Sequence, residues 1–417
     1  MKKRLLAAVL SFTLAIAPIS GVKAQGISSA QKNMTASISG AVVDVRTMSA
    51  ITEAPTQEEP GKELKVGIYD KDGSNVSAAT PYALTKKSQI DNPKVNSYEV
   101  MVPAGYSKDA LIPVKVKSRG ALFLGVLNGF GSEVSISRIY KEAACVNYTY
   151  VSQNVAYIPS AGTYYIKIDK YNFSGGAEHS FLAQFAFVSG ANTELKNKTN
   201  VINATFGQKS PLFYKMSVKK TTKIVVSINL EYSGYATLCN AKKAALTSEE
   251  YVYSKGDKLV YVVPKGTYYL KIKSMQGFVS TTATYVAVSN SAGASKAKAG
   301  TLKVNGQTKN ILICPKDSAS RAYYLKFNNP KRQTIKLNVK SSYTSGKVQL
   351  EFYDAKGTKF GSKCTIYNGV GRKNVYTPYS YTYGSSAKKL PKGTYYIKVK
   401  KIDKRTSGII EVNVKNK

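Results

Sequence analysis

The sequence predicts an all-β protein made of three tandem antiparallel β-sandwich domains, Ig-like or jelly-roll-like in kind. A short phrase recurs three times, as PSAGTYYIKI at 159–168, PKGTYYLKI at 264–272 and PKGTYYIKV at 391–399. Such repetition indicates copies of one folding unit. Strand-length apolar runs separated by Gly, Pro, Asn and Ser fill the chain, without a sustained helical apolar period. The phrase glycines lie 104 and 127 residues apart, which matches the usual domain size of roughly 100 to 150 residues.

The N-terminus predicts export. Lys2, Lys3 and Arg4 precede an apolar stretch from Leu5 to Ile19, and small residues end it at Ala24. This is the pattern of a signal peptide over residues 1–24. The stretch is shorter than the roughly 20 residues that a membrane helix needs, and no later segment is longer and apolar. We therefore expect a secreted, extracellular protein without a membrane span.

Composition shifts divide the mature chain. Residues 25–62 carry few aromatic residues and several Pro and Glu, which predicts a flexible leader. Linker-like stretches at 189–200 and 289–300 separate the repeats. The predicted sandwich modules, hereafter the first, second and third copies, are 63–190, 191–290 and 291–417.

Matching strands are expected in each copy. The runs that open the three cores lie at 120–126, 223–229 and 334–339. A second strand should follow at 134–140, 235–240 and 348–354, and a terminal strand at 181–188, 284–288 and 409–414. Each run is rich in apolar or β-branched residues, as strands are.

The repeated phrase predicts a turn followed by a strand. Proline and glycine favour the turn, and alternation then sends successive side chains to opposite faces of the strand. The first Tyr and every second residue after it should face the core. The outward positions form three tyrosine and lysine stripes: Tyr165 and Lys167; Tyr269, Lys271 and Lys273; Tyr396, Lys398 and Lys400.

In P-x-G-T-Y-Y-[IL]-K-[IV] and the strands around it, the chain resembles the bacterial pre-peptidase C-terminal domains, small β-sandwich modules found after the catalytic domains of secreted peptidases. The likeness covers three segments of about 100 residues each. No peptidase domain accompanies them here. The resemblance implies an accessory exported module for surface attachment, substrate targeting or assembly, without catalysis of its own.

Positive charge rises toward the C-terminus. The first copy with its leader, residues 25–190, has 16 basic and 14 acidic residues; the second has 14 and 5; the third has 27 and 5. A field concentrated in one module attracts anionic polymers, although a solvated lysine face that protects strand edges is an equal alternative. Beyond the stripes, the densest basic positions are Lys331, Arg332, Lys388, Lys389, Lys401, Lys404 and Arg405.

These observations predict an exported, non-catalytic binding or adhesion protein, retained at a cell surface or on anionic polymers by its basic third copy. Expected partners are an anionic cell-wall polymer or acidic polysaccharide and other surface proteins, and not a specific nucleic-acid sequence. One alternative is an accessory carbohydrate-binding protein that uses the Tyr-rich strand faces. Another is a non-catalytic part of a secreted enzyme assembly.

Catalytic and metal-binding patterns are weak. The chain has one histidine, His179, and four cysteines, which do not form a metal-ligand motif. We expect no enzyme activity, no metal and no cofactor. Only Cys314 and Cys364 could form a disulfide within one module, and two free buried thiols are an equal alternative.

Overall fold

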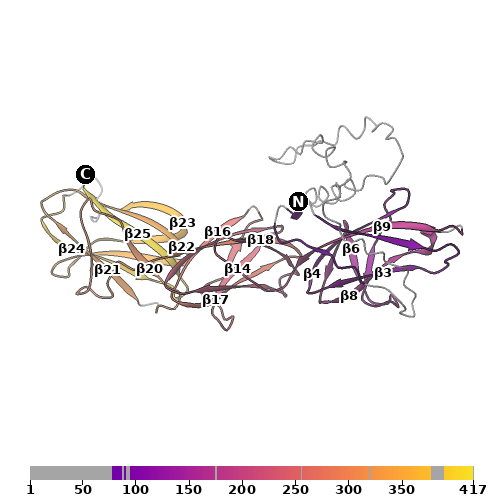
Figure 1. The fold of residues 1–417 in the computed structure, drawn as a ribbon. Coiled ribbons are helices and arrows are strands. Elements are labelled where there is room, and N and C mark those ends of the chain that lie inside the picture. Colours follow the sequence, from indigo (N-terminus) through magenta and orange to yellow (C-terminus); the bar gives the residue numbers. More distant parts are fainter. Residues whose placement is uncertain are drawn as a thin grey trace, which may run out of the picture. The chain divides into compact units, whose positions relative to one another are not determined.

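A computed structural model describes residues 78–86, 89–90, 94–173, 176–254, 256–318, 321–376 and 389–416. The named elements in this part are β-strands and one short 3-10 helix (Figure 1), so the predicted all-β class is confirmed. No helix within these ranges is long and apolar enough to cross a membrane. The predicted signal peptide, the leader and Lys388 lie outside the described residues.

The chain forms two compact units. The first contains the first copy together with Val201–Phe206, and the second contains Asn192–Asn200 and everything from Gly207 onward. Apart from residues 201–206, the second and third copies therefore belong to one compact unit.

The first unit has one continuous sheet of order β1-β9-β4-β7-β6-β5-β8-β3, with β2 also paired to β9. Its core contains Leu122, Ile166 and Phe185, which are buried within a single apolar cluster. The elements are β1 (Tyr82–Ala83), β2 (Asn96–Val102), β3 (Ala110–Val116), β4 (Gly120–Asn128), β5 (Arg138–Tyr140), β6 (Tyr148–Ser152), β7 (Val155–Ile158), β8 (Gly162–Ile168), η2 (Lys170–Phe173) and β9 (His179–Ser189). β11 (Asn200–Thr205) falls mostly within the 201–206 stretch of this unit.

In the second copy, one sheet has the order β10-β12-β17-β14-β15, and a second sheet contains β18, β13 and β16 as neighbours. Strict alternation along β13 buries Ile224, Val226 and Ile228, as expected for a strand with one face on a core. The elements are β10 (Thr193–Glu194), β12 (Leu212–Val218), β13 (Thr222–Leu230), β14 (Gly234–Cys239), β15 (Glu250–Val252), β16 (Asp257–Val263), β17 (Gly266–Ser274) and β18 (Gly277–Ala287).

In the third copy, one long strand replaces two of the expected ones. β22 pairs with β25 up to Thr344 and with β24 from Val348 onward. Between these halves Ser345 and Gly346 have φ values of 66° and 77°, and the register with β23 shifts, as at a β-bulge. The elements are β19 (Gly300–Leu302), β20 (Lys309–Ile313), β21 (Ala322–Asn329), β22 (Ile335–Asp354), β23 (Lys359–Tyr376), β24 (Gly393–Lys401) and β25 (Ser407–Asn416).

The repeated phrase has the same local structure in all three copies. Its glycines, Gly162, Gly266 and Gly393, have φ values of 153°, 155° and 156°, a region that side chains with a Cβ rarely adopt. The hydroxyl of the first tyrosine donates a hydrogen bond to the carbonyl four residues earlier: Tyr164 to Ser160 at 3.1 Å, Tyr268 to Pro264 at 3.1 Å and Tyr395 to Pro391 at 3.0 Å. The phrase is therefore a turn that leads into a strand. The first tyrosine of that strand caps a carbonyl of the turn.

Removing one of these hydroxyls should destabilise its turn. We expect Tyr268→Phe to lower the free energy of unfolding of the second unit by about 1 kcal/mol, because the Pro264 carbonyl loses its donor. Urea unfolding of the full chain measures the change. Tyr269→Phe removes the adjacent hydroxyl from the outward face and is the matched control. Equal effects of the two substitutions would contradict the capping role.

The second and third copies are joined by hydroxyl groups on a strand edge. Thr344 Oγ1 accepts a hydrogen bond from the Val260 amide at 2.8 Å and donates one to the Val260 carbonyl at 2.9 Å. Ser407 Oγ does the same with Val262, at 2.9 and 3.1 Å. Beside these bonds, Val262, Leu312 and Ile409 are buried in one cluster. Two side chains thus form the backbone hydrogen bonds that a neighbouring strand would otherwise form with Val260 and Val262 at the edge of β16.

Candidate functional site

The repeated strands alternate as the sequence predicts. Tyr164, Tyr268 and Tyr395, and each second residue after them, are buried. The outward residues Tyr165, Tyr269 and Tyr396 and the lysines that follow them on the same face are half-exposed. The three predicted stripes therefore lie on sheet surfaces, and their neighbours on adjacent strands decide what each one can bind.

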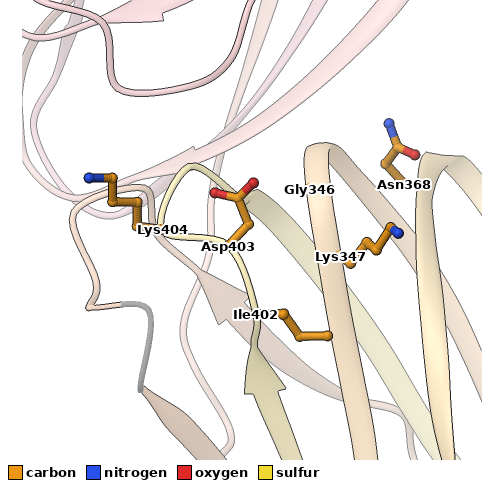
Figure 2. Close-up of a pocket in the computed structure, with 6 residues that line it drawn as sticks. All are labelled: Gly346, Lys347, Asn368, Ile402, Asp403 and Lys404. Carbon is orange, nitrogen blue, oxygen red and sulfur yellow. The ribbon is translucent and has the colours of Figure 1, made fainter.

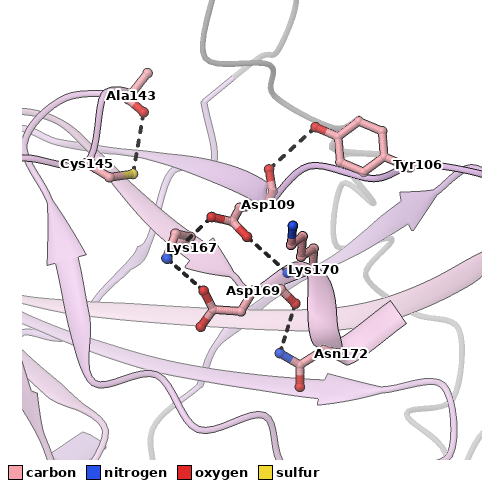
Figure 3. A network of polar contacts seen from close by, with 8 residues as sticks. All are labelled: Tyr106, Asp109, Ala143, Cys145, Lys167, Asp169, Lys170 and Asn172. Carbon is pink, nitrogen blue, oxygen red and sulfur yellow. Dashed lines mark hydrogen bonds and ion pairs between the residues drawn. The ribbon is translucent and has the colours of Figure 1, made fainter. Parts of the chain in front are cut away.

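In the first copy, carboxylates neutralise the stripe. Lys167 Nζ lies 2.6 Å from Asp169 and 3.4 Å from Asp109 (Figure 3). The hydrogen bond that the Lys167 ammonium donates to Asp169 is the main reason that the pKa of Lys167 is raised well above its ordinary value. Asp109 also accepts the Lys170 amide at 3.1 Å. This lysine already has two anionic partners, so the stripe of the first copy offers little attraction to an external anion.

In the second copy, two stripe lysines share one carboxylate. Lys273 Nζ lies 2.5 Å from Glu249, and Lys271 Nζ lies 4.0 Å from it. Tyr269 contacts Phe213, and Lys243 Nζ lies 5.5 Å from the centre of the Tyr269 ring. The ring is therefore part of a packed cation–π group rather than an open platform.

In the third copy, lysines outnumber carboxylates on the sheet face. Glu351 pairs with Lys359 at 3.4 Å and with Lys398 at 3.5 Å. Burial acts to raise the pKa of Glu351, but the Tyr353 hydroxyl and these two lysines outweigh it and hold the pKa below its ordinary value. Across the strands, Lys326 is opposite Tyr396, which is opposite Tyr353.

Further lysines extend this third face. Lys400 is opposite Ala322 on β21 and Gln349 on β22, neither of which carries a charge. Lys296 Nζ lies 4.7 Å from the centre of the Tyr396 ring. We call the outward face of β21, β24 and the second half of β22 the basic face; its members are Tyr324, Lys326, Gln349, Glu351, Tyr353, Tyr396, Lys398 and Lys400.

The carboxylates of the third copy are already engaged within it. Glu411 pairs with Lys340 at 3.2 Å, and Glu351 pairs with its two lysines. Asp317, Asp354 and Asp403 accept main-chain hydrogen bonds from Cys314, Thr358 and Arg405. Five acidic residues among 27 basic ones leave most of the positive charge without an internal counter-charge.

The other predicted basic residues lie in two further places. Lys331, Arg332 and Lys389 are exposed and adjoin the bridge between Gln333 and Leu390. Lys404 and Arg405 are exposed in the loop between β24 and β25. An open depression there is lined by Gly346, Lys347, Asn368, Ile402, Asp403 and Lys404 (Figure 2). Its lining has two lysines and one aspartate, so this depression is less cationic than the basic face, which has three lysines and one glutamate.

The prediction that Lys401 belongs to the binding surface is wrong. This residue is fully buried, and its ammonium donates to the carbonyls of Cys314, Pro315 and Asp317 at 2.9, 3.5 and 3.1 Å. Alternation along β24 turns Lys401 inward, whereas Lys400 faces outward. Burial lowers its pKa, against the raising effect of Asp317. Lys401 therefore stabilises the segment 314–317 against β24 and cannot bind a ligand at the surface.

The disulfide between Cys314 and Cys364 is not formed. Cys314 packs against the cluster of Val262 and Ile409, whereas Cys364 packs against the core of the third copy. The two thiols thus lie in different apolar surroundings. Burial raises the pKa of Cys314 to about 12, so it is protonated near neutral pH.

Sequence reasoning missed four exposed tyrosines on β6 and at β15. Tyr148 and Tyr150 on β6 are 39% and 66% exposed, and Tyr251 and Tyr253 at β15 are 47% and 62% exposed. The signal was a Tyr-x-Tyr pair that precedes the phrase in the first and second copies. Within the described ranges, no three His, Cys, Asp or Glu residues gather as a metal site would require.

No protein-family description matches the chain, and no curated protein matches it. Among solved structures, the CUB1-EGF-CUB2 segment of human MASP-1/3 aligns at 8% identity and a TM-score of 0.16, covering 52% of this chain and 98% of that one. The PBSX exported protein XepA aligns at 10% identity and a TM-score of 0.17, covering 52% and 88%. Tripeptidyl peptidase 2 aligns at 9% and 0.18, covering 78% and 34%. Scores of this size assign neither a fold family nor a function.

Proposed function

We propose that this is an exported, non-catalytic binding protein of three tandem β-sandwich modules, similar to pre-peptidase C-terminal domains. The basic face of the third copy retains it on an anionic polymer of the cell surface, such as a cell-wall polymer or an acidic polysaccharide. The observation that carries the proposal is the surplus of lysines on this face, where Lys326 and Lys400 have uncharged neighbours across the strands.

The three equivalent faces support this choice of site. The first copy has one stripe lysine between two carboxylates, and the second has two lysines at one carboxylate. Beyond these, among the described residues, the first face has one exposed lysine, Lys115, and the second has one, Lys215, which is opposite Glu194. The third face has two, Lys326 and Lys400, beyond the lysines at its carboxylate. Surplus ammonium groups on a rigid sheet attract a polyanion and exchange its counter-ions, without reading a sequence.

The test removes three lysines from the basic face of the full chain. We expect K326Q/K398Q/K400Q to weaken binding to a DNA duplex, used as a calibrated polyanion, and to heparin, an acidic polysaccharide. For DNA, the slope of log K against log salt should fall by roughly 2 to 3, at about 0.9 per lost phosphate contact. Two duplexes of unrelated sequence should bind equally.

K209Q/K219Q/K220Q is the matched control, because it removes the same charge from exposed positions of the second copy. It should leave the slope nearly unchanged. If both triple variants lose the same affinity, net charge rather than the basic face controls binding. A full chain that binds neither polyanion at low salt would refute the proposal.

A further inference from the structure

Two copies each carry a row of three tyrosines on the strands beside the phrase strand. In the first, Tyr140 on β5 is opposite Tyr148 on β6, and Tyr150 follows on the same face. In the second, Tyr235 on β14 is opposite Tyr251 on β15, and Tyr253 follows. β5 and β14 both pair with the phrase strand of their copy, but the two rows lie at different points along it. Tyr140 is opposite Tyr165, whereas Tyr235 is opposite Lys273, four residues beyond the equivalent Tyr269.

The ring geometry of the two rows agrees. Tyr148 and Tyr150 have ring centres 5.1 Å apart at an interplanar angle of 83°, and Tyr251 and Tyr253 are 4.9 Å apart at 83°. The inner rings meet the middle ones edge-on at 6.1 and 5.5 Å. Each row thus has an inner ring that anchors a middle ring, and the middle ring in turn contacts an outer ring. Aromatic side chains favour this edge-to-face arrangement.

The outer rings are the open ones. Tyr150 and Tyr253 are 66% and 62% exposed, although such large aromatic surface is costly to leave in water. Arg138 lies 5.9 Å from the Tyr150 ring centre and still leaves that ring open. Tyr269 and Tyr396 of the phrase stripes, which lie close to Lys243 and Lys296, are only half-exposed. Two open rows with the same ring geometry, one in each of two copies, indicate a surface that a ligand covers.

We propose that the two tyrosine rows are sites that stack the pyranose rings of a glycan. A sugar ring presents an apolar C–H face with hydroxyls at its rim, which suits an open phenol ring with a hydroxyl at its tip. In the first copy the hydroxyls of Tyr148 and Tyr150 lie 3.2 Å apart, and both can form hydrogen bonds with the hydroxyls at the rim of a sugar. Arg138 lies 4.4 Å from the Tyr148 ring centre and supports that ring.

The size and charge of the rows favour a glycan over other occupants. A stable protein interface buries about 800 Å² on each partner, far more than two open rings provide. Around the second row, Lys271 and Lys273 share Glu249, which offsets one of their two charges, so a polyanion gains less there than on the basic face. The inference is separate from the basic face, whose binding depends on charge.

The experiment measures binding of the full chain to cellohexaose, chitohexaose and mannohexaose at about 0.5 M NaCl, where exposed charges are screened beyond roughly 4 Å. The chain has no Trp and 31 Tyr, so tyrosine fluorescence and near-UV circular dichroism report directly on stacking. We expect at least one hexasaccharide to bind, and Y150S/Y253S to weaken its binding about tenfold or more.

F130S/Y171S is the matched control, because it removes two aromatic rings that are 91% and 81% exposed outside the rows. It should leave glycan affinity unchanged. The inference is overturned if none of the three hexasaccharides binds, or if the control loses as much affinity as Y150S/Y253S. Binding of polyuridylic acid in place of the glycans at this salt would identify base stacking and would also overturn it.

Discussion

Replacing Lys401 by methionine should lower the free energy of unfolding of the second unit by roughly 3 to 5 kcal/mol. The methionine fills similar volume, but three buried or part-buried carbonyls lose the ammonium that bonds them, and unsatisfied polar groups away from water are costly. The segment from Cys314 to Asp317 should loosen first. Urea unfolding followed by near-UV circular dichroism, together with hydrogen exchange at residues 314–317, measures both effects.

Lys400→Met is the control for this substitution. Lys400 is adjacent in the chain but lies on the outward face, so its loss should change stability by less than about 0.5 kcal/mol. It should weaken polyanion binding instead. The opposite pattern, with Lys401→Met affecting salt-dependent binding and not stability, would show that Lys401 reaches the surface.

Thr344→Val should uncouple the third copy from the edge of β16. Valine keeps the shape of threonine, but the Val260 amide and carbonyl both lose their partner, at a cost of about 2 to 4 kcal/mol. Hydrogen exchange should accelerate at the Val260 amide. Ser407→Ala should accelerate exchange at Val262 instead, since each hydroxyl serves one residue.

The exposed Thr301→Val change is the matched control, and it should alter neither amide. If Thr344→Val and Ser407→Ala leave both amides protected, the hydroxyl bonds do not hold the two copies together. Unfolding of the double variant in two separate urea transitions would show that these bonds make the two copies cooperative.

Much of the fold follows from the order of residues along the chain. The predicted runs at 120–126 and 223–229 correspond to β4 and β13, because apolar periodicity depends only on neighbours in sequence. The inward and outward faces of the phrase strands were also predictable from alternation. The prediction went wrong at Lys401, where the same alternation turns a charged residue inward and an acceptor set from a distant loop compensates for its burial.

The candidate site was only partly predictable. Its tyrosine and lysine stripes were visible in the sequence, but the partners of the lysines were not. Asp109 is 58 residues from Lys167 along the chain, and only sheet pairing brings such groups together. The open tyrosine rows were missed for a related reason, since exposure depends on which neighbouring side chain covers each ring.

The sequence by itself determined the β architecture, the repetition and the rise in positive charge, because these are properties of local patterning and composition. Tertiary structure alone decided which lysines keep an unopposed charge, which tyrosines stay open and how Thr344 and Ser407 join two copies. These outcomes depend on contacts between strands that are far apart in the chain, where distance and solvent access set the strength of each interaction.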